Sequence, residues 1–330
     1  MLDIGDVSVI AAAPAHSLDR GPHAEIRLGR GLTAQVAAPL CRAVAAHVHA
    51  GVAVLELHMP EVERIDSIGL AALHQVGAFT AEHGVILTLV PSPALHRALL
   101  DAHLLEAFTL APLRAGEART TQCHLREDTA SGQIIATSKD LALRLPASED
   151  LSHFDAWARD PLLTHMVGSY LLYRCRHLGS GHPEVASLIL DSPSTLTALV
   201  EPLSAIGEPV GFVRLYGIGL TSAIAFLETA VMNAPARRRG WGVEASRLLV
   251  AYAMDALGLH RIEAKVFAYN TPSINALTRN SFQQEGVLRD ACLHDGKRCD
   301  ILVFSILADE VRHRRQREQY PYMGFWDRAA

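Results

Sequence analysis

Residues 233–244 read Asn-Ala-Pro-Ala-Arg-Arg-Arg-Gly-Trp-Gly-Val-Glu and lie between a predicted strand, 223–232, and a predicted helix, 243–257. A loop that leads from a strand into a helix exposes backbone N–H groups and the positive end of a helix dipole. Such a position favours an anion. Gly240 and Gly242 permit close approach of the backbone, and the arginines at 237–239 add positive potential. The stretch predicts a diphosphate site, although the pattern alone also fits an ordinary capped turn.

The segments around this loop alternate between the two periodicities that mark strands and helices. The predicted strands are 141–145, 195–201, 209–215, 223–232, 261–268 and 300–307, and the predicted helices are 150–159, 169–176, 243–257 and 273–280. Turn residues at Gly207 and 217–219 separate three of the strands, which indicates an antiparallel meander. The second half of the chain is therefore predicted to be an α+β domain.

The first half of the chain reads as a smaller α/β domain. Residues 52–59 alternate apolar and polar side chains, and a helix is predicted from Asp66, an N-cap candidate, to Gly84. A strand at 85–90 and a helix at 94–102 follow. The expected organisation is an alternating domain at 1–115, a linker at 116–139, a mixed-sheet domain at 140–310 and a basic, aromatic tail at 311–330.

Several ordered motifs make the second domain resemble the GNAT acetyltransferase superfamily. They are the run 237–244, Leu-Gly-Leu-His-Arg-Ile-Glu-Ala at 257–264, Asn-Thr-Pro-Ser-Ile at 270–274, Phe282, and Glu-Gly-Val-Leu-Arg at 285–289. More narrowly, the domain resembles the branch that acetylates N-terminal amines of ribosomal proteins. The resemblance implies a mixed sheet, acetyl-CoA or another acyl-CoA as co-substrate, no metal, and direct transfer of the acetyl group to an amine.

The same resemblance implies roles for particular residues. The pantetheine arm would be bound by the backbone of Thr229, Ala230, Val231 and Met232, the pyrophosphate by Arg237, Arg238, Arg239, Gly240, Trp241, Gly242 and Val243, and the thioester end would lie near Asn270 and Ser273.

The catalytic acid and base are less clear from the motifs. Leu277 stands where many superfamily members carry a tyrosine acid, and Lys265 stands where another branch has a glutamate base. Glu228, inside an otherwise apolar strand, is the best base candidate, because burial would raise its pKa toward a useful range. Ser273 is the nearest alternative proton donor, near Asn270, although it can equally serve as a helix cap.

Motifs in the first domain resemble a STAS domain, the fold of bacterial anti-sigma-factor antagonists. They are Leu-His-Met-Pro at 57–60, Ile-Asp-Ser-Ile-Gly-Leu at 65–70, Val-Pro-Ser-Pro at 90–93 and Leu-Leu-Glu-Ala-Phe at 104–108. The resemblance implies that Ser67, beside Asp66, is phosphorylated by a partner kinase. Alternatively, either residue caps the helix and the domain serves only for docking or dimerisation.

Composition limits the remaining classes. A chain of 330 residues with a net charge of −5 favours two soluble domains and gives no reason to expect nucleic acid. The cysteines lack a Cys-x-x-Cys pair, which argues against a disulfide framework or a thiolate metal site and favours a reducing cytoplasm. His47 and His49 are expected on a helix surface, and the tail from 310 is expected to pack on its own domain or on a second subunit. No membrane segment is expected.

Two functional hypotheses remain open from the sequence. In the first, the chain is an amine acetyltransferase with a STAS module that binds a protein partner. In the second, it is a non-catalytic signalling or scaffold protein that senses acyl-CoA through the GNAT fold. The acceptor, a peptide N-terminus or a small-molecule amine, is not specified by any motif.

Overall fold

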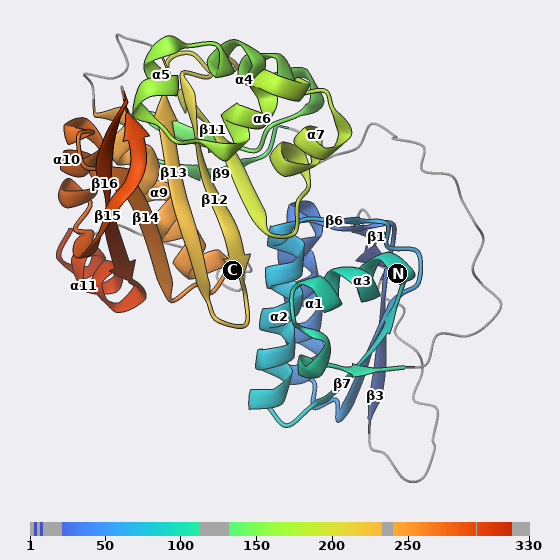
Figure 1. Ribbon diagram of the computed structural model, residues 1–330. Helices are drawn as coiled ribbons and strands as arrows, with labels where there is room; N and C mark the ends of the chain where they lie inside the picture. Colours follow the sequence, from blue (N-terminus) through green and yellow to red (C-terminus); the bar gives the residue numbers. More distant parts are fainter. Residues whose placement is uncertain are drawn as a thin grey trace. The chain divides into compact units, whose positions relative to one another are not determined.

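The computed structural model describes residues 3–4, 7–8, 22–111, 132–232, 240–294 and 296–318. The described residues form two compact units, one up to residue 111 and one from residue 132 to 318. Both units contain strands and helices (Figure 1). Among the described residues, no helix has both the length and the apolar character needed to cross a bilayer.

The N-terminal unit is an alternating α/β fold. Its sheet has the order β1-β2-β3-β5-β7-β8, and β3, β5, β7 and β8 run parallel. Its strands are β1 Asp3–Ile4, β2 Val7–Ser8, β3 His23–Leu28, β4 Gly31–Leu32, β5 Val54–Met59, β6 Arg64–Ile65, β7 Ile86–Pro91 and β8 Thr109–Leu110; its helices are α1 Ala34–His49, α2 Ser67–Glu82 and α3 Pro93–Asp101, with a short 3-10 turn at Leu105–Ala107. The two strands and two helices predicted between 52 and 102 are confirmed within a few residues.

One carboxylate organises the helix starts of this unit. Asp66 Oδ1 accepts from the amide of Gly69 at 2.8 Å and caps α2, while Oδ2 accepts from the amide of Ala34 at 2.9 Å at the start of α1. A Cβ on Gly69 would lie 2.1 Å from the carbonyl oxygen of Leu32, so glycine is required there. The predicted N-cap role of Asp66 is confirmed, and the residue also caps a second helix.

The C-terminal unit is built on a mixed sheet with the order β15-β16-β14-β13-β12-β11-β10-β9. Its strands are β9 Ile134–Thr137, β10 Leu141–Arg144, β11 Thr195–Pro202, β12 Gly211–Gly219, β13 Ile224–Val231, β14 Arg261–Phe267, β15 Gln283–His294 and β16 Lys297–Leu307; its helices are α4 Leu151–Ala158, α5 Pro161–Met166, α6 Tyr170–Leu178, α7 Pro183–Leu190, α9 Trp241–Ala256, α10 Thr271–Arg279 and α11 Ala308–Glu318, with a 3-10 turn at Ser148–Asp150. Only β13 and β14 pair in parallel among the neighbours in this sheet.

The two faces of this sheet carry different helices. A buried cluster joins α4, α6 and α7 to the strands through Phe154, Leu172, Phe212 and Ala230. These helices form one group in the green part of the chain (Figure 1). Helix α9 packs against the other face of β13, because a Cβ on Gly242 would lie 3.3 Å from Val231. Successive residues of β13 therefore contact different helices, because side chains alternate between the two faces of a strand.

A buried ionic network fixes one end of the sheet. Arg144 of β10 donates two hydrogen bonds to Asp150, at 2.8 and 2.9 Å, and one from Nε to Glu201 of β11 at 2.8 Å. Asp150 also accepts from the amide of Ala147 at 2.7 Å, and Glu201 accepts from the amide of Gly207 at 3.3 Å. Both carboxylates are thus held by several donors.

Four expectations need correction. The predicted linker, 116–139, contains strand β9, whose edge pairing with β10 extends the sheet. The predicted turn at 217–219 is the end of β12. Cys292 and Cys299 occupy opposite positions of the β15–β16 hairpin, with Cα atoms 5.2 Å apart, and form a disulfide that sequence spacing did not suggest. Helix α11 crosses the predicted start of the tail at 311.

The described part of the predicted tail packs on its own unit. Arg315 of α11 bonds Asp255 of α9, and Arg314 donates to the Ser281 hydroxyl at 3.1 Å. These contacts agree with the expectation that the tail covers its own domain. The aromatic residues predicted at 320–326 lie outside the described residues.

Candidate functional site

The parallel ladder between β13 and β14 is short. It joins Ile224–Phe226 to Arg261–Glu263, whereas β13 continues to Val231 and β14 to Phe267. In the described part of the chain, the C-terminal halves of these neighbouring strands therefore lie outside their common ladder. An extended ligand with amide groups can bind between strands that are arranged in this way.

The N-terminus of α9 lies beside the same half of β13. Gly240 is the N-cap, has a φ of 77°, and makes no side-chain capping bond. A Cβ on Gly242 would approach Val231 to 3.3 Å and Thr229 to 3.9 Å, so a glycine lets the helix start lie close to the strand. The first-turn amides of a helix without a side-chain cap suit an anion.

Hydroxyl groups bind this helix start to the strand. Thr229 Oγ1 and Ser246 Oγ lie 2.7 Å apart, and Ser246 donates to the carbonyl of Gly242 at 2.8 Å. Asn280, at the end of α10, donates to the carbonyl of Val243 at 2.9 Å. The N-cap and first turn of α9, residues 240–243, are therefore held in place by contacts from both β13 and α10.

Not every backbone group predicted to bind the pantetheine arm is available for a ligand. The amide of Met232 donates to the carbonyl of Val210 at 2.8 Å, so this N–H group is already used within the sheet. Ala230 is buried in the cluster under α4 and α6. Arg237, Arg238 and Arg239 lie outside the described residues, and their predicted contacts with the pyrophosphate stay predictions.

Asn270 serves as a connector. Its Oδ1 accepts from the amide of Ser273 at 3.1 Å and caps α10, and its Nδ2 donates to the carbonyl of Met166 at 2.8 Å. The helix thus begins at Thr271, ahead of the predicted start at Ser273. Both polar atoms of the Asn270 side chain are engaged, so the structure supports a positioning role for Asn270. Ser273 stays a predicted proton donor, with its amide bonded to Asn270.

Glu228 lies on the face of β13 that carries α4 and α6. Burial raises the pKa of its carboxyl, and the nearby Arg214 guanidinium and a hydrogen bond from Ser169 partly offset this rise. Arg214 Nη1 lies 3.7 Å from Glu228 Oε2, and the side chains are 4% and 10% exposed. Glu228 comes two residues after the last position of the β13–β14 ladder.

The segment before α6 joins these parts of the site. Met166 accepts from Asn270, and Ser169, three residues later, bonds Glu228 and caps α6 through the amide of Leu172. A Cβ on Gly168 would lie 2.8 Å from the ring of Phe267, the last residue of β14. The segment 166–169 therefore brings Glu228, Asn270 and the end of β14 together.

The hairpin at the other side of β14 completes this region. The ring of Tyr269 stacks between Phe267, at a centroid distance of 5.3 Å, and His294, at 3.9 Å. The segment 166–169 and His294 therefore both lie near the end of β14. Lys265 is exposed, with Nζ 5.4 Å from the ring centroid of Phe226, and Leu277 is buried.

Sequence reasoning did not identify Arg214, Ser169 or Ser246. A charged residue within the apolar strand 211–216 was the available signal for Arg214, the same signal that identified Glu228. The two serines carry no such signal, because serine at a helix start or on a helix face is common.

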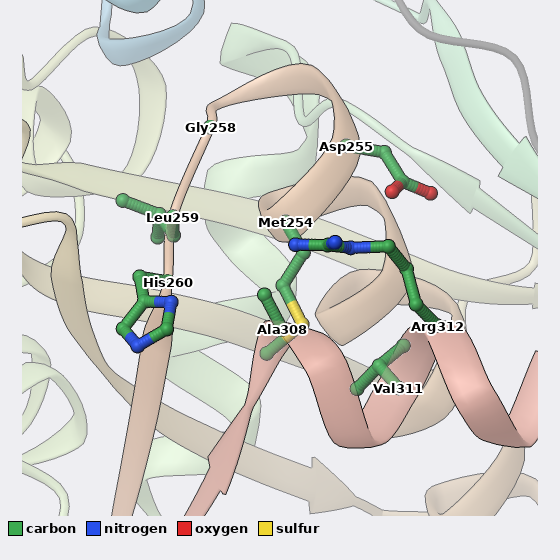
Figure 2. A pocket seen from close by; sticks show the side chains of 8 residues that line it. All are labelled: Met254, Asp255, Gly258, Leu259, His260, Ala308, Val311 and Arg312. Atoms are coloured by element: carbon green, nitrogen blue, oxygen red, sulfur yellow. The ribbon is translucent and has the colours of Figure 1, made fainter.

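A hollow elsewhere in this unit is separate from these residues. It lies between the end of α9 and the start of α11, and its lining residues are Met254, Asp255, Gly258, Leu259, His260, Ala308, Val311 and Arg312 (Figure 2). It is at the opposite end of α9 from Gly242, about 20 Å away by the rise of a helix. The hollow is therefore not the predicted diphosphate site.

In the N-terminal unit, the structure places Ser67 at the first position of α2 with 1% exposure. A kinase needs access to the hydroxyl it modifies. In this conformation, the predicted phosphorylation site is not accessible, because Ser67 lies in the interior.

Comparison with known proteins agrees with the C-terminal motifs. Residues 140–283 match the family described as acetyltransferase (GNAT) domain. The chain is 46% identical over 72 residues to the uncharacterized N-acetyltransferase p20 of Bacillus licheniformis, and 41% identical over 70 residues to the uncharacterized N-acetyltransferase YoaA of Bacillus subtilis. These alignments cover 22% and 21% of the chain, and the chain spans 40% of the length of each of these relatives.

Among solved structures, RimJ of Mycobacterium smegmatis in complex with CoA-disulfide is 26% identical, with a TM-score of 0.43. That alignment covers 54% of this chain and 89% of RimJ. The family match and the relatives together show that the C-terminal half carries a GNAT acetyltransferase domain.

Proposed function

We propose that this protein transfers an acetyl group from acetyl-CoA directly to a primary amine, either a peptide N-terminus or a small-molecule amine. The observation that carries the proposal is the short β13–β14 ladder beside the glycine N-cap of α9. The family match at 140–283 supports the same reaction class.

The C-terminal unit offers a place for each part of acetyl-CoA. The close approach of Gly242 to Val231 leaves the start of α9 beside the strand, where its first-turn amides suit the pyrophosphate. The half of β13 beyond Phe226, with Thr229 and Ala230, would receive the pantetheine arm. The thioester would then lie toward the segment 166–169 and Asn270, which meet at the end of β14.

The chemistry requires a neutral amine. Its nitrogen attacks the thioester carbon, a C–N bond forms and the C–S bond breaks, and the proton that the nitrogen then loses passes to the thiolate of coenzyme A. Glu228 would accept the proton that the ammonium group loses, because burial moves its pKa toward neutrality. Ser273 is the proposed donor to the thiolate, and Asn270 holds the start of α10 in place.

The test measures thiol release from acetyl-CoA by the full chain with a panel of peptide and small-molecule amines. Replacing Glu228 with Gln should lower kcat by about 10²- to 10⁴-fold while acetyl-CoA still binds. Glu285→Gln is the matched control, because Glu285 pairs with Arg261 and Ser305 on the exposed hairpin. An unchanged rate in Glu228→Gln would remove this residue from the mechanism.

Acetyl-CoA binding without thiol release for any amine would instead favour the sensor or scaffold hypothesis. In that case, direct calorimetry with acetyl-CoA would still report binding, and Gly242→Val should weaken it because the new side chain overlaps Val231. The two functions are therefore separated by turnover and not by binding.

For the N-terminal unit, the proposed role is a STAS-type module that binds a protein partner. The parallel strands alternating with helices and the Asp66 cap, with Gly69 against Leu32, support this role. Phosphorylation of Ser67 would require the first turn of α2 to open, since the hydroxyl is buried. Incubation with serine kinases of the host, followed by intact-mass measurement with Ser67→Ala as control, tests it, and an unchanged mass would count against the switch.

A further inference from the structure

Three polar side chains form a buried row across the middle of the C-terminal sheet. Thr197 of β11 lies opposite Arg214 of β12, and Arg214 lies opposite Glu228 of β13. They are 2%, 3% and at most 10% exposed. Thr197 Oγ1, Arg214 Nε and Glu228 Oε1 have no hydrogen-bond partner among the described residues. Buried polar atoms in native proteins usually have partners, so a row of three such atoms needs an explanation.

The two oxygens of Glu228 have different surroundings. Oε2 faces Arg214 Nη1 at 3.7 Å, a distance that allows ionic attraction but exceeds a hydrogen bond. Oε1 has no partner within the described residues. The carboxylate is therefore held from one side while its other oxygen keeps its acceptor capacity.

Arg214 has little else to bind. Its guanidinium lies 5.6 Å from the ring centroid of Tyr216, and its Nε has no partner in the described structure. An arginine stays protonated even when buried, so Arg214 supplies a fixed positive charge beside Glu228. A positive charge at this distance favours the ionised form of a carboxyl.

Other groups face the same pair. Cys175 of α6 has its pKa raised to about 12, chiefly by burial, and Tyr216 of β12 has its pKa raised, also chiefly by burial. Both are therefore neutral at physiological pH. The charge of Asp155 of α4 further raises the pKa of Cys175, and the charge of Glu263 of β14 further raises the pKa of Tyr216. Lys265 lies over the ring of Phe226. Arg214 is the cation that interacts directly with Glu228.

We propose that Arg214 is a positioning residue that holds Glu228 through Oε2, keeps the carboxylate ionised inside the protein, and leaves Oε1 directed to take the proton of the acceptor amine. This inference rests on the proposed acetyl transfer and assigns the proton-accepting atom within it. In the reaction, one N–H bond of the ammonium breaks, an O–H bond forms at Oε1, and the freed electron pair attacks the thioester.

The first test is the pH dependence of kcat/KM in Arg214→Gln and Arg214→Lys. Loss of the fixed charge should move the acidic limb of the profile upward by about one to three pH units, and lysine should restore part of the shift. Arg261→Gln, which removes two ion pairs at the far end of β14, is the control and should leave the profile in place. A uniform loss of rate at every pH would show a merely structural role and overturn the proposal.

The second test does not need turnover. If Arg214 keeps Glu228 ionised, the loss in melting temperature caused by Arg214→Gln should grow as pH rises through the folded pKa of Glu228, and it should become independent of pH in a Glu228→Gln background. A pH-independent loss in both backgrounds would overturn the inference. If the stability coupling is present but no amine is acetylated, the failure belongs to the proposed function and not to the Arg214–Glu228 interaction.

Discussion

Two arginine–carboxylate clusters lie in the same sheet of the C-terminal unit, and they differ in how completely their polar atoms are bonded. Arg144 donates to both oxygens of Asp150 and to Glu201 Oε1, the Ala147 amide adds a bond to Asp150 Oδ2, and the Gly207 amide binds the other oxygen of Glu201. Arg214 and Glu228 approach only to 3.7 Å, and each keeps a buried atom without a partner among the described residues.

The fully bonded cluster is suited to stabilising the fold, whereas the incompletely bonded one is suited to reacting with a ligand. A fully bonded network has no capacity left for a ligand, but it fixes the strands that it joins. An incompletely bonded carboxylate reduces stability and can react with a substrate. Arg144 and Glu201 lie on strands of the same sheet as Arg214 and Glu228.

The largest expected effect is a change at the fully bonded cluster. Arg144→Met would leave the buried Asp150 and Glu201 without their cation and should lower the free energy of unfolding by about 3–5 kcal/mol. Urea unfolding followed by circular dichroism measures this loss. Arg214→Met should cost less, because Glu228 can become protonated; an equal loss in the two variants would break the comparison.

A partly buried carboxylate in the N-terminal unit, that of Asp66, tests whether full bonding predicts stabilisation elsewhere. Asp66 accepts from two helix starts, so Asp66→Ala should destabilise the unit by about 1–4 kcal/mol, the range for two lost caps. Asp66→Asn, which retains an acceptor oxygen, should lose less. Thermal unfolding of the full chain is the measurement, and equal stability of Ala and Asn variants would contradict the capping role.

The two clusters should respond to pH with opposite signs. Burial raises the pKa of Asp150, but bonds from Arg144 and the Ala147 amide outweigh it, so its folded pKa is lowered. Its contribution is present above the unfolded pKa of about 4 and is lost as pH falls through the lower folded pKa. Glu228 has a raised folded pKa, so its contribution is present at low pH and is lost as pH rises through that pKa.

Substitution by the neutral amide shows these signs directly. Asp150→Asn should destabilise the protein most above about pH 4, whereas Glu228→Gln should gain stability relative to the natural protein as pH rises through the raised folded pKa of Glu228. Melting temperatures from about pH 2 to about pH 8 measure both, because Asp150 titrates below about 4 and Glu228 above about 4.5. Parallel curves for the two variants would contradict the assignment.

The smallest effect is expected at the hydroxyl that bonds Glu228. Ser169→Ala removes a bond that favours the ionised carboxyl, so the acidic limb of the pH–rate profile should move upward by less than about one unit. Ser152→Ala, on a neighbouring helix, is the control because its hydroxyl is exposed and bonds the carbonyl of Glu149. A shift larger than that of Arg214→Gln would reverse the ranking of the two neighbours.

Much of the fold followed from periodicity and capping. Asp66 and the strand at 52–59 were placed correctly, because a strong N-cap and strict alternation leave few alternatives. Strand β15 was not predicted, since most of its residues are exposed and its apolar residues Val287, Leu288 and Leu293 do not face the core. Edge strands of this kind lack the alternation on which a sequence reading depends.

The candidate site was predicted in part. Glu228 and Gly242 carried local signals, a charge in an apolar strand and a glycine before a helix. The ion pair of Arg214 and the hydrogen bonds of Ser169 and Met166 arise from strand register and from contacts between distant segments, which spacing along the chain does not encode. The Cys292–Cys299 disulfide also depends on the register of a hairpin that was not predicted.

The shared cap at Asp66 has a consequence for communication within the N-terminal unit. Because one carboxylate binds the first turns of both α1 and α2, neither helix start can release it without altering the other. Opening of the first turn of α2 at Ser67, the residue after Asp66, would therefore weaken the hydrogen bond at the amide of Ala34, which is distant in sequence. The rates of amide hydrogen exchange in the two first turns should therefore change together. A partner that binds α1 would then respond to a change at the start of α2 without contacting α2.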